Sequence, residues 1–238
     1  MRAYFGILLA CVLAFGSATG IAGDLSTTYF RIDVANGSES AFYEVLTADV
    51  AYDPDAQRWS WASSGAIPLG EVAVLNSANL TIVGDPQIAL NFAMTAGPLP
   101  TTVTITTAVL SFGPYSNPVG LASAGITLTE SNGDTALLTG LGGSGNAYVS
   151  LYNVPPGTVF AEFIPQVYEP DAGGSTAASG STPGWVPIAG SVFSMQAQFS
   201  FELSAYDQAS GTSIYAIVPE PAALVLLAVG GMLTLRRR

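Results

Sequence analysis

Hydrophobic and polar residues alternate along most of this chain with a period of two. The longest alternating run is residues 193–203, and residues 87–95 follow the same pattern with Ile88, Leu90, Phe92 and Met94 on one face. Successive side chains of a β-strand point to opposite faces of a sheet, so this period predicts strands with one buried face. No window of twelve residues keeps the spacing of an amphipathic helix. The body of the chain is therefore predicted to be all-β.

Turn residues divide this pattern into about eleven short strands. Asn36-Gly37 and Asn132-Gly133 are typical of tight turns. Residues 135–138 are predicted to return antiparallel to the strand at 125–130, and residues 170–187, rich in Gly, Ser, Ala and Thr, to form a long loop. The remaining strands are predicted over residues 29–34, 43–52, 58–62, 72–75, 87–95, 101–112, 147–152, 159–168, 193–203 and 214–218. This number of strands favours an antiparallel two-sheet sandwich over residues 23–217, jelly-roll-like rather than immunoglobulin-like.

The first 22 residues have the three parts of a secretory signal peptide. Arg2 is followed by an apolar stretch over residues 5–15 and then by small residues up to Gly23. Cleavage after Ala22 or Gly20 fits the preference for small residues. A lipoprotein site at Cys11 is the alternative, but it leaves only about five apolar residues before the cysteine. Cys11 is the only cysteine, so an exported body would have no disulfide and no thiol chemistry.

Residues 218–238 also consist of three parts in a fixed order. A rigid acidic turn, Pro219-Glu220-Pro221, is followed by an uncharged apolar run at residues 222–235 and then by Arg236, Arg237 and Arg238. As a helix, the run would extend about 21 Å, which is short of a hydrocarbon core about 30 Å thick. Arginine side chains can snorkel to cover such a shortfall, and basic residues are retained on the cytoplasmic side. The predicted membrane anchor comprises Ala222, Leu224, Leu226, Leu227, Val229, Leu233 and Leu235.

This segment resembles the PEP-CTERM sorting signal of exosortase substrates, found in diderm bacteria that make exopolysaccharide. The resemblance rests on Val218-Pro219-Glu220-Pro221, the apolar run with Gly230 and Gly231, and the arginine cluster. It covers about a tenth of the chain. It implies transient insertion in the inner membrane, processing near Pro219 to Pro221 by an exosortase, which is a membrane cysteine peptidase, and delivery to the cell surface or extracellular matrix.

The charge of the body limits its partners. Only Arg31 and Arg58 of the six basic residues lie between the two end segments, against sixteen of the 17 acidic residues, a net charge of −14. Such a field repels nucleic acid and anionic lipid. Cations, or exopolysaccharide bridged by cations, are better partners.

The residues that are absent exclude most enzyme classes. The chain has no histidine and no lysine, and its cysteine lies in the signal peptide. Triads with histidine, thiol nucleophiles, Schiff bases and zinc sites built from histidine or thiolate are therefore excluded. Carboxylate chemistry is left, as in a glycosidase with two acids facing across a cleft. No cofactor is expected, with calcium as the one candidate ion, because carboxylates in loops suit it.

Two sets of residues are candidates for binding. Asp53 and Asp55 in one turn, and Asp134 in another, are the candidate calcium ligands. Trp59 and Trp61 lie two apart on one strand face, where they serve either as core residues or as a platform for sugar rings, and Trp185 lies in the long loop. The sequence favours a non-catalytic surface or matrix protein; a carbohydrate-binding module and a carboxylate glycosidase are the alternatives.

Overall fold

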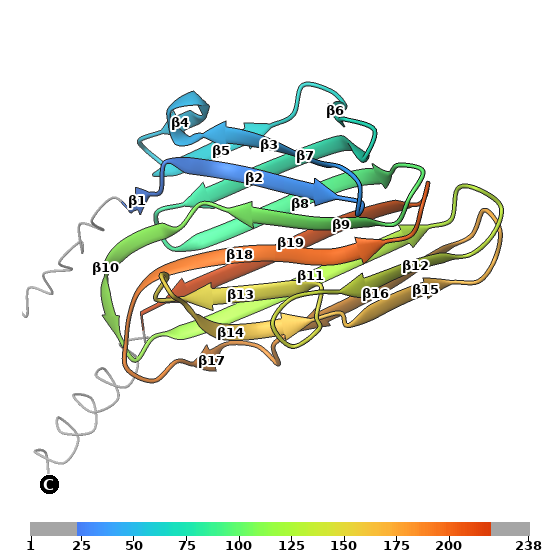
Figure 1. Cartoon of the computed structure of the whole chain (residues 1–238). Helices are drawn as coiled ribbons and strands as arrows, with labels where there is room; N and C mark the ends of the chain where they lie inside the picture. The colour runs from blue at the N-terminus through green and yellow to red at the C-terminus, as the bar shows by residue number, and fades with distance from the viewer. Residues whose placement is uncertain (1–22, 220–238) are drawn as a thin grey trace, which may run out of the picture.

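The computed structural model describes residues 23–219, which form two antiparallel β-sheets packed face to face (Figure 1). The all-β prediction and the two-sheet sandwich are confirmed. Within the described residues, no helix is long and apolar enough to cross a membrane. The predicted signal peptide, the anchor residues Ala222 to Leu235, and Glu220, Pro221 and the terminal arginines lie outside the described range.

Sheet A lies in front in Figure 1 and contains ten strands, with the central order β1-β10-β18-β9-β2-β3. The additional strands β12 and β13 pair with β18, and they in turn pair with β15 and β14. The bounds are β1 (Asp24–Leu25), β2 (Thr28–Ala35), β3 (Ser40–Leu46), β9 (Thr101–Thr107), β10 (Leu110–Ser116), β12 (Ala136–Gly140), β13 (Tyr148–Tyr152), β14 (Thr158–Phe163), β15 (Gln166–Glu169) and β18 (Ser191–Leu203).

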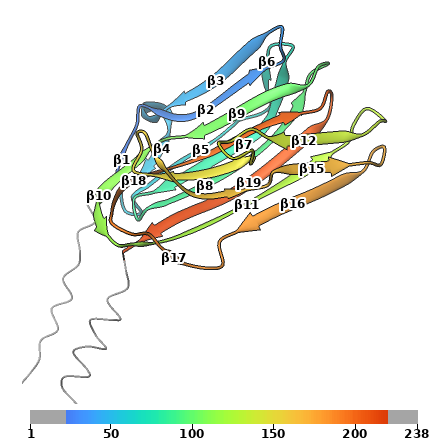
Figure 2. The ribbon, with the colours of Figure 1, turned by 60° about the horizontal axis from the view of Figure 1, so that its bottom comes forward.

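Sheet B contains nine strands, with the order β16-β11-β19-β8-β7-β5-β4, while β17 pairs with β11 and β6 with β7. The bounds are β4 (Ala51–Asp53), β5 (Arg58–Ala62), β6 (Ile67–Leu69), β7 (Ala73–Val83), β8 (Gln87–Ala96), β11 (Val119–Thr129), β16 (Ser175–Ser181), β17 (Val186–Pro187) and β19 (Gln208–Val218). Figure 2 shows β16, β11 and β19 lying side by side along one layer, as their pairing requires.

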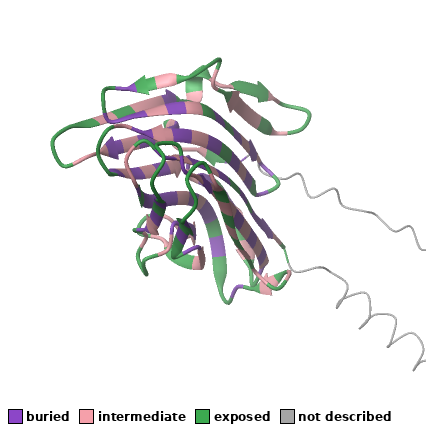
Figure 3. Ribbon diagram, turned by 90° about the vertical axis from the view of Figure 1, so that its right-hand side faces the viewer, coloured by how far each residue is buried: buried purple, intermediate pink, exposed green. Residues whose placement is uncertain are grey.

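The core lies between the two sheets and is made by the inward positions of the alternating strands. Buried and more exposed residues alternate along the strands in Figure 3. At its centre the ring of Phe92, from β8, contacts Phe199 and Phe201 of β18, with ring centroids 5.0 and 6.0 Å apart. Gly211, the neighbour of Phe92 on β19, leaves the space that the Phe92 ring occupies. The apolar face predicted for residues 87–95 is therefore the face of β8 that packs against sheet A.

A buried tyrosine links the sheets by hydrogen bonds as well. Tyr29 and Phe30 are both fully buried, because the pairing of β2 with β3 shifts register between Thr28 and Phe30. The Tyr29 hydroxyl faces the carbonyl oxygens of Trp59 and Leu80 in sheet B, at 2.8 and 3.0 Å. Burial raises the pKa of the Tyr29 hydroxyl, so it remains a neutral donor at physiological pH.

Three predicted strands are each broken in two. The run at 43–52 is interrupted by a 3-10 turn, η1 (Thr47–Asp49), which separates β3 in sheet A from β4 in sheet B. The run at 101–112 breaks between β9 and β10 at Ala108, whose amide bonds to the Tyr29 carbonyl. The run at 159–168 breaks at Ile164, which adopts a positive φ of 68° before Pro165. The first break falls at Thr47, Ala48 and Asp49, whereas the other two fall within apolar residues, at Ala108-Val109 and Ile164-Pro165.

Three further expectations about residues 135–203 are wrong. Residues 136–140 do not return along β11 but cross to sheet A, where they pair with β15 and β18. The predicted loop at 170–187 contains β16, whose seven residues all pair with β11, and the short β17. Small side chains do not prevent a complete backbone ladder. Phe193, on the alternating face of residues 193–203, is 47% exposed rather than in the core, because the alternation of β18 changes face at Ser194 and Met195, which are both buried.

The space around Phe92 can be tested with two glycines on neighbouring strands. In Gly211→Ala the new methyl group would overlap the Phe92 ring, so we expect the free energy of unfolding to fall by about 1–3 kcal/mol. Gly125→Ala is the matched control, because its methyl group would make only ordinary contacts at 3.8 Å. It should be neutral or stabilising by up to about 1 kcal/mol. Urea denaturation of both variants measures the difference; equal losses would contradict this account of the core.

Candidate functional site

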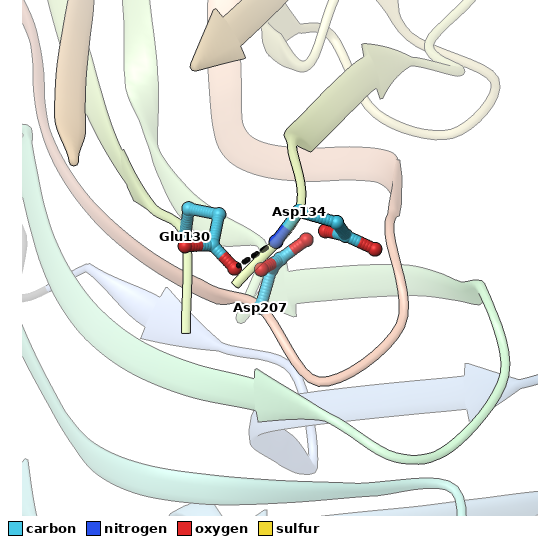
Figure 4. A group of neighbouring side chains, drawn as sticks. All are labelled: Glu130, Asp134 and Asp207. Atoms are coloured by element: carbon cyan, nitrogen blue, oxygen red, sulfur yellow. Dashed lines mark hydrogen bonds between the residues drawn. The ribbon is translucent and has the colours of Figure 1, made fainter. Parts of the chain in front are cut away.

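Three carboxylates gather at one end of sheet B. Glu130 directly follows β11 and Asp207 directly precedes β19, and the paired residues Thr129 and Gln208 bring them side by side. Asp134 joins them from the loop between β11 and β12 (Figure 4). One carboxylate oxygen from each residue lies within 4.8 Å of the others. We call Glu130, Asp134 and Asp207 the acidic cluster.

Glu130 holds the surrounding loops by accepting backbone hydrogen bonds. Its Oε1 accepts from the amides of Asn132 at 2.6 Å and Asp134 at 3.1 Å, and from the amide of Gly133. Its Oε2 accepts from the amide of Gly173, which precedes β16. The Gly173 bond is the main cause of a lowered Glu130 pKa, with the other three adding to it against the effect of burial. Glu130 is thus an ionised residue that fixes two loops.

The pKa of Asp207 is shifted in the opposite direction to that of Glu130. Its side chain is fully buried and accepts from the Ser131 amide at 3.1 Å and from the Ser204 hydroxyl. Burial raises the Asp207 pKa, and the neighbouring charges of Asp134 and Glu130 raise it further, while the two hydrogen bonds lower it in part. The cluster therefore brings together one carboxylate stabilised in its charged form and one that is destabilised in it.

The oxygen atoms of the cluster are the type that calcium prefers. Asp134 is the only predicted calcium ligand that the structure places in the cluster. Both oxygens of Glu130 already accept hydrogen bonds, so a cation would have to share them. Asp53 instead caps its own turn, where it accepts from the amides of Asp55 and Ala56 and pairs with Arg58 at 3.3 Å. Sequence reasoning missed Glu130 and Asp207, which no linear spacing connects.

The predicted tryptophan residues lie at opposite edges of sheet B. Trp61 stacks on Phe30 with ring centroids 5.1 Å apart, and Trp59 stacks on Tyr52 at 4.7 Å. Both are partly buried and pack against the core, which supports the core alternative for this pair. Trp185 is 51% exposed and precedes β17, which pairs with β11. The three rings therefore do not form one platform.

The outer face of sheet B carries a shallow hollow of about 590 Å³ over β16, β11 and β19. Gly125 contributes no side chain to the hollow, and the other lining side chains are uncharged and, apart from Ile214, short. They include Ser123, Ser179, Ser181, Thr212 and Ile214. The hollow lacks the titratable groups and aromatic rings that would define a ligand class.

Comparisons with known proteins leave the family open. No family model matches the sequence, and no curated protein matches it. Among solved structures, the chain is similar to one described as the structure of infectious bursal disease virus Gt strain, with 8% sequence identity and a TM-score of 0.22. That match covers 82% of this chain and 67% of the other. A TM-score this low carries no argument about fold or function.

The opposite pKa directions in the cluster predict opposite effects of two neutral substitutions. Glu130 has a lowered pKa, so its charge stabilises the fold above its ordinary pKa of 4.5, and this stabilisation is lost as the pH falls through the folded value. Glu130→Gln should therefore lower the melting temperature at pH 7 and flatten its decline in acid. Asp207 has a raised pKa, so its charge opposes folding as the pH rises above its ordinary value of 3.8.

Asp207→Asn should leave stability at pH 7 unchanged or raise it, because the amide oxygen still accepts a hydrogen bond without adding negative charge. Melting temperatures from pH 3 to pH 7 compare the two variants with the unsubstituted protein. Equal destabilisation by both substitutions at pH 7 would contradict the assignment of opposite roles.

Proposed function

We propose that this chain is an exported, non-catalytic component of the cell surface or extracellular matrix of a diderm bacterium. The observation that carries the proposal is the sequence of residues 218–238, with its Val-Pro-Glu-Pro turn, apolar run and terminal arginines. In this proposal an exosortase-type peptidase removes the segment after transient insertion in the inner membrane. The segment is a sorting signal and contributes nothing to the activity of the body.

The position of Val218 supports this division of the chain. Val218 is the last residue of β19, and its backbone still pairs with Val119 of β11. Pro219, which follows, is exposed and lacks an amide donor, so the ladder ends there. Cleavage beyond this residue would leave every strand of the sandwich intact. Within the described residues, the strand pairing therefore ends at Val218, the first residue of the proposed signal.

The geometry of the sandwich also suits attachment at one end. In Figures 1 and 2, β1 and the C-terminal end of β19 lie at the same end of the sandwich. The acidic cluster lies at the other end of β19, about 35 Å away for eleven residues of extended strand. While the apolar segment is in the membrane, the body would stand on its β1 end and present the acidic cluster to the outside.

The proposal is tested by the intact mass and location of the protein from its own cells. We expect a mass that lacks about 20 N-terminal residues and everything beyond Pro219 to Pro221, in a surface or matrix fraction. Replacing Pro219, Glu220 and Pro221 together by alanine should retain the C-terminal segment and leave the protein in the inner membrane. The control replaces Asn36, Gly37 and Ser38, a turn elsewhere in the body, and should not change processing.

A native protein that keeps residues 222–238 and fractionates with the inner membrane would refute processing and mean a stable anchor. A native protein found in the cytoplasm with residues 1–22 present would refute export altogether.

A further inference from the structure

The outer face of sheet A carries charged side chains around an exposed aromatic ring, which the hollow over β16, β11 and β19 of sheet B lacks. The pairing of β3, β2, β9 and β18 sets its side chains in cross-strand rows. One row contains Phe42, Asp33, Thr104 and Ser200; the next contains Glu44, Arg31, Thr106 and Gln198; the third contains Ser40, Ala35, Thr102 and Glu202. Carboxylate, guanidinium, amide and hydroxyl groups thus share one face with Phe42.

Arg31 is fixed on this face by its neighbours. Its Nε and Nη2 donate to the two oxygens of Asp33, at 2.8 and 2.6 Å, and Nη1 lies 4.0 Å from Glu44. The guanidinium carbon lies 4.4 Å from the centre of the Phe42 ring. The ring is nevertheless 61% exposed, the largest exposed fraction among the large hydrophobic side chains described. Polar groups therefore surround the Phe42 ring, which has the Arg31 guanidinium over one face and remains mostly exposed.

A groove of about 450 Å³ runs beside this ring over β3, β2 and β9. Ala35 and Ser40 are its short side chains, while Arg31, Asp33, Phe42 and Thr104 form taller walls. The groove lies where Ser40 and Ala35 of the third row stand beside the larger Phe42 and Asp33 of the first row. We call Arg31, Asp33, Ala35, Phe42 and Thr104 the Phe42 groove.

We propose that the Phe42 groove binds an uncharged polysaccharide. The apolar C–H face of a sugar ring fits an exposed aromatic ring, and its hydroxyls fit carboxylate, guanidinium and threonine groups held in fixed positions. Charge selects the ligand class: the only cation in the groove is paired with Asp33 and Glu44, and the body carries −14. An anionic polymer would be repelled. The site goes beyond the proposed surface role and does not depend on the sorting segment.

The test is affinity electrophoresis of the purified protein in gels that contain one polysaccharide each. The neutral probes are dextran, pullulan, hydroxyethyl cellulose, laminarin, galactomannan and the neutral fraction of the producer's own exopolysaccharide; alginate is the anionic probe. We expect retardation by at least one neutral probe, unchanged by 0.5 M NaCl, and none by alginate. Phe42→Ala should weaken binding about tenfold or more, whereas Phe42→Tyr should retain it.

Two further variants separate the groove from a general loss of structure. Ala35→Leu should weaken binding by filling the groove without removing a polar group. Ile214→Ala removes another exposed hydrophobic side chain, 43% accessible, from the outer face of sheet B and should bind like the unsubstituted protein. Both variants should keep the far-ultraviolet circular dichroism and melting temperature of the unsubstituted protein.

Three outcomes would overturn the proposal. The first is no retardation by any neutral probe. The second is retardation that survives both Phe42→Ala and Ala35→Leu. The third is a dimer in sedimentation experiments that Phe42→Ala dissociates, because the face would then be an interface between copies of this chain. None of these outcomes affects the proposed sorting, which is measured by mass and cell fraction.

Discussion

The sandwich depends on the close packing of its two sheets around the ring of Phe92. This ring comes from sheet B, contacts Phe199 and Phe201 of sheet A, and occupies space left by Gly211. The fold has no disulfide in the described residues, so burial of apolar side chains must offset the entropy of ordering some twenty strand segments. Tyr29 adds a polar link across the same gap, where its hydroxyl faces two carbonyl oxygens of sheet B.

Because the inner faces form this core, only the outer faces are open to other molecules, and the Phe42 groove of sheet A differs in chemistry from the hollow of sheet B. Sheet A places Arg31, Asp33 and Glu44 near an exposed Phe42, whereas the hollow of sheet B is lined by uncharged side chains that, apart from Ile214, are short. This difference in chemistry arises because the outward-facing positions of β2 and β3 hold charged and aromatic residues, whereas those lining the hollow on β11, β16 and β19 hold none. Polar groups in fixed positions next to an apolar ring can select a ligand by its shape and hydrogen-bonding groups. A flat surface of short hydroxyl side chains offers no such selection.

The acidic cluster serves first as part of the architecture. The Glu130 carboxylate accepts hydrogen bonds from backbone amides of the loop after β11 and from the Gly173 amide before β16. It therefore holds two loops at the end of sheet B. Asp207 is destabilised in its charged form, because it is buried beside two other carboxylates, and its pKa is raised. A cation would relieve that repulsion only by competing with the hydrogen bonds that hold the loops.

The sequence by itself determined the all-β class, the sandwich, and most strands, because the period of two is a local property of the chain. It also determined the net charge and the exclusion of histidine and lysine chemistry. Only the tertiary structure decided that residues 136–140 cross to sheet A, that the small-residue stretch 175–181 forms a strand, and that Asp134 meets Glu130 and Asp207. Strand pairing joins residues far apart in the chain, and neither composition nor spacing records which strands become neighbours. The same holds for the Phe42 groove, whose walls come from three strands and become one site only through their register.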